Sequence, residues 1–472
     1  MTDRRTSRRA LIGAGGALAA GLALSPRGGR AAAPKQPNIL FILADDLGYA
    51  DVSCYGRPDY KTPNIDRLAA EGMRFVQAYA NSAVCSATRV GLMTGRYQNR
   101  LAVGLEEPMG RRPVGLPADH PTLPSLLRKA GYTTGLIGKW HLGEPPKFGP
   151  LVSGYDHFWG FHGGGLDYFD HTGPKADLWD DDRRDPEPGY MTDLIGQRAV
   201  QMIDHFADAG RPFLLSLHFN APHWPWEGPD AEAESKRLST VKGGILAFDT
   251  GSQKTFAAMV TRMDFQIGRV LEALKTRGLD QDTIVVFTSD NGGERYSDNW
   301  PFTGRKTELL EGGLRIPAIV RWPGQVQPGA VSDQVMITMD WLPTFLATAN
   351  AAPDPAYPPD GISLVDALHG AAPVKRVLFW RYLNMAQEAC RDGDFKYLKI
   401  FKNTFLFNVV EDPLERANLK TRLPDVYARL VGEFRSWNAT MLPLDKKAST
   451  WGFTGAQAAD HFGIKTQTTL SD

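Results

Sequence analysis

Apolar runs that end abruptly in polar residues constrain the fold of this chain more than any other feature. Asn38 to Ala44 is a continuous apolar run, as expected of a strand buried on both faces, and Asp45 and Asp46 follow it at once. The same arrangement recurs three times. The further runs are Thr133 to Gly138, followed by Lys139 and His141, Phe213 to Phe219, followed by Asn220 and His223, and Thr283 to Ser289, followed by Asp290 and Asn291.

Helical patterns lie between these runs. They are a segment that opens at Thr62-Pro63, and the segments Thr122 to Ala130, Thr192 to Ala209 and Phe256 to Lys275. Strands that alternate with helices predict an α/β fold with a largely parallel sheet flanked by helices. In such sheets ligands bind beyond the carboxyl ends of the strands, where all of the polar residues named above fall. We therefore expect one site at that edge.

A second pattern begins at about Pro373. It predicts a small α+β subdomain over residues 373–443, with strands at Arg376 to Arg381, Lys396 to Ile400 and Thr404 to Asn408 and a helix from Leu423 to Trp437. The expected organisation is thus a main catalytic domain over residues 34–372, this subdomain, and a tail over residues 444–472. Because the tail is polar and mixed in composition, we expect it to wrap the surface.

The first 33 residues differ from the rest and read as a signal peptide. An apolar stretch from Ala10 to Leu24 follows four arginines and precedes an Ala triplet, and Ser7 to Leu11 resembles the twin-arginine export motif. Fifteen weakly apolar residues are too few for a stable membrane anchor. We expect a periplasmic or secreted protein; a disordered basic tail is the alternative.

The charge balance excludes some classes of partner. Lys plus Arg and Asp plus Glu number 53 each, so the chain lacks the basic surplus of a nucleic-acid-binding protein or of one attracted to anionic membranes. A local cationic site for an anion remains compatible with this balance.

The acidic residues at the strand ends suggest a metal site. Asp45, Asp46, Asp290 and Asn291 offer only oxygen ligands, and adjacent carboxylates repel one another unless a cation lies between them. A hard cation such as calcium fits this set better than a transition metal. The alternative is that Asp45 caps a loop and Asp290 opens an ordinary turn.

Three cysteines cannot form a disulfide framework, and an odd number leaves at least one thiol unpaired. Cys54 and Cys390 read as small buried apolar residues, although a bond between them stays open. Cys85 precedes a segment, Thr88 to Gly95, that fits a short helix, and a helix N-terminus stabilises negative charge. The alternative for Cys85 is an inert buried thiol.

The neighbours of Cys85 carry a family resemblance. Cys85 to Arg89 resembles the signature Cys-X-Pro/Ala-X-Arg of the type I, formylglycine-dependent sulfatases, with Ala87 where Pro is commoner, and Gly138 to Gly143 is similar to their second signature. The resemblance spans about residues 38 to 440. It implies an alkaline phosphatase-like fold with a large, mixed, mostly parallel sheet and a smaller C-terminal α+β subdomain. Further matching segments are Asp45 to Gly48, Thr62 to Ala69, Pro222 to Pro225, Ser289 to Gly292, Gly304 to Lys306 and Glu311 to Pro317.

The resemblance also implies a mechanism. Cys85 is oxidised to formylglycine, and the hydrate of that aldehyde attacks sulfur, forms a sulfate ester on residue 85 and then expels sulfate. One calcium ion is held by Asp45, Asp46, residue 85, Asp290 and Asn291. The remaining roles fall to Arg89, which activates the attacking hydroxyl, Lys139, which orients it, His141, the base of the elimination step, and Lys306 and His223, which hold sulfate and protonate the leaving oxygen.

The same resemblance implies partners in maturation: a formylglycine-generating enzyme, acting before export, and the twin-arginine translocase. The expected substrate is a sulfate ester of a carbohydrate or an aryl alcohol. The aromatic, Gly-rich segment from His157 to Phe169 reads as a loop that stacks on a substrate ring or packs beneath the site. Trp179 to Arg184 reads as a solvated loop.

Two rival functions remain. Some formylglycine hydrolases of the same superfamily cleave phosphonate monoesters or phosphodiesters, whose phosphorus centre needs similar charge neutralisation. An exported protein that binds sulfated glycans and keeps an unmodified Cys85 is the second rival.

Overall fold

The structure is a computed structural model that describes residues 36–108, 113–172, 176–241, 250–445, 447–461 and 463–464. The expected signal peptide, residues 1–33, lies outside the described residues. So does the end of the tail, residues 465–472. Among the described residues, none of the helices has the length and apolar composition that a bilayer-spanning segment requires.

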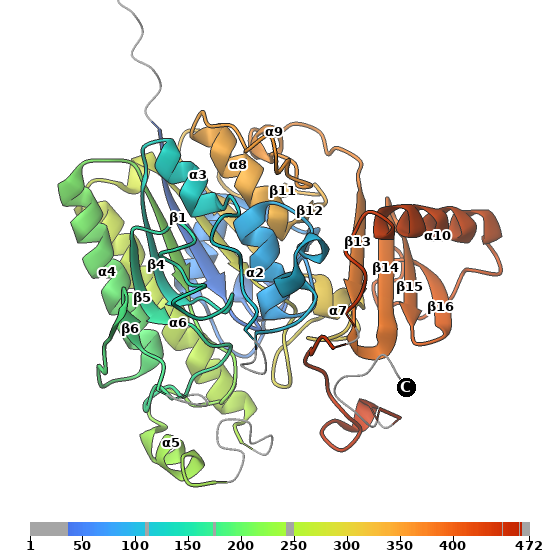
Figure 1. The fold of residues 1–472 in the computed structure, drawn as a ribbon, viewed down its shortest axis with the longest axis horizontal. Coiled ribbons are helices and arrows are strands. Elements are labelled where there is room, and N and C mark those ends of the chain that lie inside the picture. Colours follow the sequence, from blue (N-terminus) through green and yellow to red (C-terminus); the bar gives the residue numbers. More distant parts are fainter. Residues whose placement is uncertain are drawn as a thin grey trace, which may run out of the picture. The chain divides into compact units, whose positions relative to one another are not determined.

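A ten-stranded sheet forms the main part of the fold (Figure 1). Its five central strands run parallel, in the order β9 (Thr283–Ser289), β1 (Asn38–Ala44), β8 (Phe213–His218), β4 (Thr133–Lys139) and β5 (His157–Phe161). The strands at one edge are β10 (Ala318–Arg321), β2 (Met73–Phe75) and β11 (Ala330–Ser332), and those at the other are β6 (Trp179–Asp180) and β7 (Arg183–Arg184). The antiparallel pairs lie toward the edges, so the predicted mixed, mostly parallel sheet is confirmed.

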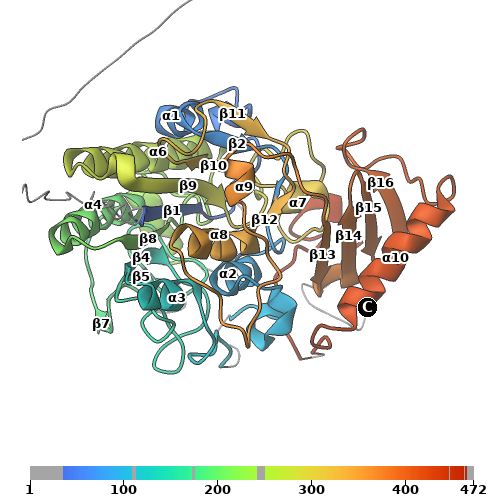
Figure 2. The same cartoon turned by 90° about the horizontal axis from the view of Figure 1, so that it is seen from above.

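Alternate residues of β1 pack against helices on opposite faces of the sheet. Leu40, Ile42 and Ala44 belong to a core cluster with α1 (Pro63–Glu71), α4 (Met191–Ala209) and α6 (Gln253–Thr276). Ile39, Phe41 and Leu43 belong to a second cluster with α2 (Cys85–Thr94), α3 (Leu123–Lys129) and α8 (Trp341–Thr348). Figure 2 shows these two helical layers with the sheet between them. Both faces of β1 are buried, which explains its continuous apolar sequence.

The four predicted strands and four predicted helices are all present, with ends shifted by three residues or fewer. Thr122, for example, is the N-cap of α3 and accepts a hydrogen bond from Ser125 N at 3.2 Å. Two loop predictions are wrong. His157–Phe161 forms β5, and the segment from Trp179 to Arg184 forms the β6–β7 hairpin, because each pairs with a neighbouring strand that its own sequence does not reveal.

The carboxyl-terminal region contains a four-stranded antiparallel sheet and one long helix, which include the three strands and the helix predicted there. Its strands are β13 (Val377–Tyr382), β14 (Gln387–Asp392), β15 (Phe395–Ile400) and β16 (Asn403–Asn408), and its helix is α10 (Pro424–Asn438). Strand β14 was not predicted. A core cluster joins this sheet to the main part through residues such as Tyr79, Leu309 and Trp380.

Smaller elements complete the fold. They are the pair β3 (Ala78–Tyr79) and β12 (Met336–Ile337) and the short helices α5 (Glu232–Leu238), α7 (Glu311–Leu314) and α9 (Val365–Leu368).

The tail differs from the surface wrap that its composition suggests. Thr450, Phe453 and His461 are buried, because the segment 447–461 packs against the same side of the molecule as the polar strand ends. All three cysteines are free, so the open possibility of a bond between Cys54 and Cys390 is not realised.

Candidate active site

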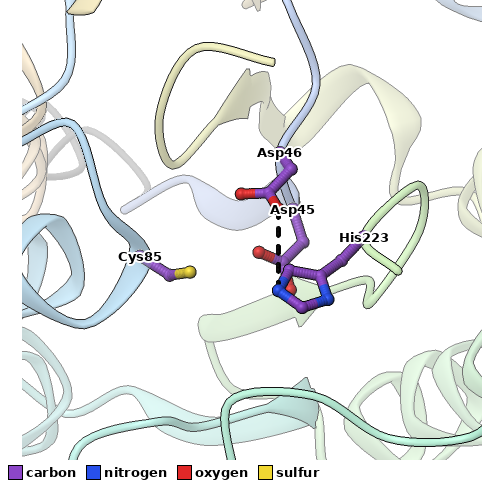
Figure 3. A group of neighbouring side chains, drawn as sticks. All are labelled: Asp45, Asp46, Cys85 and His223. Carbon is purple, nitrogen blue, oxygen red and sulfur yellow. Dashed lines mark ion pairs between the residues drawn. The ribbon is translucent and has the colours of Figure 1, made fainter. Parts of the chain in front are cut away.

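Polar residues from four separate parts of the chain meet beyond the carboxyl ends of the central strands. Ligand atoms of Asp45, Asp46, Cys85 and His223 all lie within 4.8 Å of one another, and all four residues are buried. Figure 3 shows the two carboxylates between Cys85, which comes from the start of α2, and His223, which follows β8. The strand ends in the sequence place Asp45, Asp46 and His223 at one edge of the sheet and the family resemblance adds Cys85; the structure brings the four together.

Asp290 and Asn291 complete this cluster. Asp290 Oδ1 accepts a hydrogen bond from Asp46 N at 3.2 Å, and Asn291 Nδ2 donates to Asp46 Oδ1 at 2.8 Å. Asp45 Oδ1 and Asn291 Oδ1 are buried without a hydrogen-bond partner. Since buried acceptors are normally satisfied, these two oxygens and their carboxylate neighbours suit a hard cation such as calcium.

Three buried basic side chains contact the three carboxylates. Lys139 Nζ lies 2.6 Å from Asp45 Oδ2, and Lys306 Nζ lies 2.7 Å from Asp46 Oδ2. Arg89 donates to Asp290 Oδ2 from Nη2 at 2.8 Å. The three cations thus surround Cys85 with positive charge, and an anionic group could bind there.

These three cations do not fully offset the cost of burying the ionised carboxylates. Burial raises the pKa of Asp45 to about 8; Lys139 lowers it, but Asp290 and Asp46 add repulsion. Ionised carboxyl groups in such a position need a further positive charge nearby. This electrostatic deficit agrees with the two unpartnered oxygens in indicating room for a cation.

The Cys85 thiol is a poor nucleophile as it stands. It is the first residue of α2 and only 2% exposed. Burial raises its pKa well above the usual range, and Lys139 and Lys306 offset this only in part. Because the thiolate is the reactive form, an unmodified Cys85 would be largely inert at neutral pH.

The side chains of His141 and His223 are both in the neutral form. Burial and the nearby Lys139 and Arg89 hold the pKa of His141 well below its usual range, and burial with Lys306 and Lys139 does the same for His223. His223 Nδ1 lies 2.6 Å from the carbonyl oxygen of Trp224, so Nδ1 carries the proton and Nε2, 3.5 Å from Asp46 Oδ2, is free to accept one. His141 Nδ1 has no partner.

The structure also reveals residues that sequence reasoning missed. His218, the last residue of β8, is buried with Nδ1 3.1 Å from the Lys139 carbonyl oxygen and 3.3 Å from Arg89 Nη1. Because His218 is the last residue of a strand, its position in the sequence could have indicated that it lies at the site. Gly164 lies against His141, since a Cβ built on it would be 2.5 Å from the His141 Nε2 atom. The Gly-rich stretch after β5 therefore packs at the site itself.

Gly164→Ala is expected to slow turnover about 100-fold while the protein stays folded, because the added methyl displaces the His141 ring by about 1 Å. The measurement is kcat for an aryl sulfate together with the thermal unfolding midpoint. Gly432→Ala in α10 is the matched control, since a Cβ there meets nothing within 4 Å. Unchanged kcat in Gly164→Ala would show that the position of His141 does not limit the reaction.

Comparisons with known proteins agree with this geometry. The family model described as Sulfatase matches residues 37–351. The chain is 34% identical over 390 residues to N-acetylgalactosamine-6-sulfatase of Canis lupus familiaris, covering 76% of this chain and 71% of that protein. It is 31% identical over 493 residues to arylsulfatase J of Mus musculus, covering 91% of this chain and 80% of that protein.

A solved structure, Ps i-CgsB in complex with k-i-k-neocarrahexaose, superposes with a TM-score of 0.79 at 29% identity, covering 92% of this chain and all (100%) of that chain. The resemblance carried by Cys85 to Arg89 and Gly138 to Gly143 is thereby confirmed. The chain belongs to the sulfatase family and is a hydrolase of sulfuric esters.

Proposed function

We propose that this sulfatase removes sulfate from a carbohydrate ester, with residue 85 acting as a formylglycine hydrate. The observation that carries the proposal is that Arg89, Lys139 and Lys306, each paired with a carboxylate of the site, lie within electrostatic range of the buried residue 85. Once a calcium ion neutralised those carboxylates, the three cations would match a tetrahedral sulfate placed between them. A saccharide is favoured as the alcohol because one of the proteins reported above is an N-acetylgalactosamine-6-sulfatase and another was solved in complex with k-i-k-neocarrahexaose.

The metal-binding residues are proposed to be Asp45, Asp46, residue 85, Asp290 and Asn291. Calcium bound there would neutralise these carboxylates and polarise a sulfate oxygen. Asp290 has a second task, because its Oδ2 atom accepts two hydrogen bonds from Arg89, at 2.8 and 3.1 Å. That pair fixes the guanidinium beside residue 85.

The proposed roles of the remaining residues follow from their positions. Residue 85, once converted, would present two hydroxyls on one carbon, one to attack sulfur and one to expel sulfate afterwards. Each of the two lysines would turn from its carboxylate, Lys139 toward the hydroxyl of residue 85 and Lys306 toward sulfate oxygens. The free Nε2 of His223, which faces Asp46, would take up the proton that the attacking hydroxyl loses and pass it to the leaving oxygen, and His141 would remove the proton of the second hydroxyl.

Mass spectrometry of the tryptic peptide from Phe75 to Arg89 tests the modification. Conversion replaces the sulfur and two hydrogens of Cys85 by one oxygen, so the peptide becomes lighter by that difference. An unconverted peptide in a fully active preparation would contradict the formylglycine proposal. An unconverted peptide together with no turnover is the result expected of a silent glycan-binding protein.

Kinetics separate the sulfatase from a phosphonate or phosphodiester hydrolase with the same site. We expect kcat/KM for an aryl sulfate to exceed that for an aryl phosphonate monoester by at least about tenfold, since the site is assigned to sulfate. A preference for the phosphonate would overturn the assignment.

Removal of calcium is expected to abolish turnover and to lower the thermal midpoint by several degrees, because the carboxylates of Asp45, Asp46 and Asp290 would be left to repel one another. The measurement is a thermal melt of protein treated with a chelator, with and without added calcium. Asp45→Asn removes one of these charges, so its midpoint should shift less on calcium removal than that of the wild type. An identical midpoint for treated and untreated wild type would argue against a resident cation.

Export and chain organisation are part of the proposal. Residues 1–33 would direct the folded and modified protein through the twin-arginine translocase to the periplasm or beyond, after a formylglycine-generating enzyme has acted on Cys85. The division into a catalytic domain (34–372), an α+β subdomain (373–443) and a tail (444–472) is likewise proposed.

A further inference from the structure

The tail segment 447–461 lies beside the active site and is fixed at both of its ends. Near its start, Trp451 N donates to Glu107 Oε1 at 2.6 Å, and Tyr382 Oη donates to the Trp451 carbonyl oxygen at 2.5 Å. Near its end, His461 Nε2 lies 3.1 Å from Glu308 Oε1. Glu308 is two residues from Lys306, so the segment spans from one flank of the site to the other.

The anchor at Trp451 lies within electrostatic reach of the site. Burial raises the pKa of the Glu107 carboxyl group, and the charges of Lys306 and Lys139 lower it. Burial, Glu107 and Cys85 raise the pKa of the Tyr382 hydroxyl. Ordering each residue of this polar segment costs about 1–2 kcal/mol of conformational entropy. Holding the segment at this position therefore favours a functional role for it.

An aromatic pair lies at the anchor of Trp451. The ring of Trp451 lies 5.8 Å from that of Trp224, which in turn lies 4.4 Å from the ring of His223. Both tryptophans are half-buried, and Trp224 Nε1 is buried without a hydrogen-bond partner. The two indole rings thus offer apolar surface, and Trp224 Nε1 a free hydrogen-bond donor, directly beside His223, the residue proposed to protonate the leaving oxygen.

A buried carboxyl group lies in the loop that follows Asn291. Glu294 is 6% exposed, and its Oε2 atom has no hydrogen-bond partner. Its other oxygen, Oε1, lies 4.0 Å from Arg295 Nε, and the charges of Arg295, Asp46 and Lys306 all act on this carboxyl group, which places it close to the sulfate-binding Lys306. A buried unpaired carboxyl oxygen is costly unless a ligand supplies a donor, and a sugar hydroxyl is such a donor.

We propose that Trp451 of the tail, Trp224 and Glu294 form the pocket for the alcohol part of the substrate, and that they select a sugar ring carrying one sulfate and no other charge. The inference rests on the proposed sulfatase function. The two indole rings would contact the apolar face of the sugar, Glu294 would bind a ring hydroxyl, and a second sulfate or carboxylate on the sugar would meet the carboxyl groups of Glu294 and Glu107.

The test uses the full-length calcium-loaded enzyme with three probes: a monosulfated hexosamine or hexose, a disulfated sugar, and inorganic sulfate as a competitive inhibitor. Trp451→Ala and Glu294→Gln should each lower kcat/KM for the monosulfated sugar at least about tenfold, as expected for loss of one aromatic contact or one charged hydrogen bond. The Ki of inorganic sulfate should stay within about twofold, since sulfate alone does not reach the pocket.

Two further variants make the result specific. Trp451→Phe keeps an aromatic ring and should restore most of kcat/KM, whereas Phe265→Ala, which removes an exposed ring from α6, should leave all three readings unchanged. Glu294→Gln should also narrow the preference for monosulfated over disulfated sugar, an effect that simple destabilisation would not produce.

Equal losses for sugar turnover and sulfate binding in Trp451→Ala, or no loss in either variant, would overturn the inference. A wild-type enzyme that hydrolyses aryl sulfates but no sugar sulfate would overturn it as well and leave the sulfatase assignment standing. Absence of turnover on every sulfate ester would instead refute the proposed function on which the inference rests.

Discussion

Cys85→Ala is expected to abolish turnover of every sulfate ester, by at least about 10⁴-fold in kcat, while the protein remains folded. Residue 85 supplies the nucleophile in the proposed mechanism, and none of the neighbouring side chains can replace two hydroxyls on one carbon. The fold should survive because the substitution removes only one sulfur atom from the first residue of a helix, where Ala is well tolerated.

The measurement is kcat on an aryl sulfate, with the unfolding midpoint in denaturant as the check on folding. Cys390→Ala is the matched control, because it also removes a buried free thiol but from β14, outside the site. It should retain nearly full kcat. Substantial activity in Cys85→Ala would refute the assignment of residue 85.

A second readout links the result to the modification. In preparations of the wild-type protein with different degrees of conversion, kcat should be proportional to the converted fraction of the peptide from Phe75 to Arg89. A preparation with the plain thiol should be folded and nearly inactive, because burial keeps the pKa of that thiol high and the thiolate scarce.

The sequence predicts the central strands and the candidate site well because both depend on local patterns. A strand buried on two faces has a continuous apolar sequence, and the end of such a strand is marked by the first polar residues, as at Asp45 and Asp290. Parallel strands then bring those ends to one edge of the sheet. Position along the chain was therefore enough to gather the residues that follow strands, whereas Cys85, Arg89 and Lys306 were placed at the site only by the family resemblance.

The features that sequence reasoning missed depend on partners far away in the chain. Strand β5 is aromatic, borders a Gly-rich stretch and forms because β4 offers a parallel edge for it. Strand β14 contains Glu388, Arg391 and Asp392, which are unusual in a strand until β13 and β15 pair with it on both sides. The role of the tail was hidden for the same reason, because Trp451 meets Glu107 and Trp224 only in the folded chain.

The carboxyl-terminal sheet is joined to the main part by a buried ionic cluster, and the second large effect is expected there. Lys396 of β15 is fully buried (0% exposed), with Nζ 2.9 Å from Glu311 Oε1 and 3.0 Å from Glu415 Oε1. Burial opposes ionisation of Glu311, but Lys396, Arg315 and Arg391 outweigh it and hold its pKa well below the usual range. Lys396 thus neutralises two carboxyl groups that have no access to water.

Lys396→Met is expected to lower the free energy of unfolding by about 3–5 kcal/mol, because it leaves Glu311 and Glu415 buried beside each other without their shared cation. The measurement is equilibrium unfolding in denaturant. Lys399→Met on the same strand is the matched control. Its partner Glu388 is 2.6 Å away, but both side chains are partly exposed, so the loss there should be under about 1 kcal/mol.

The loss in Lys396→Met should depend on pH in a direction that follows from Glu415. Burial raises the pKa of Glu415 to about 7, Lys396 lowers it and Glu311 raises it, so removal of Lys396 moves the pKa of the folded state further up. The folded variant then keeps a proton that the unfolded chain releases above about pH 4.3, and its stability falls as the pH rises toward the folded-state pKa. The difference from the wild type should therefore be larger at about pH 8 than at about pH 5. A deficit that is the same at both pH values, or no larger than that of Lys399→Met, would show that the carboxyl groups do not depend on Lys396 and that the sheet is held in place by its apolar contacts alone.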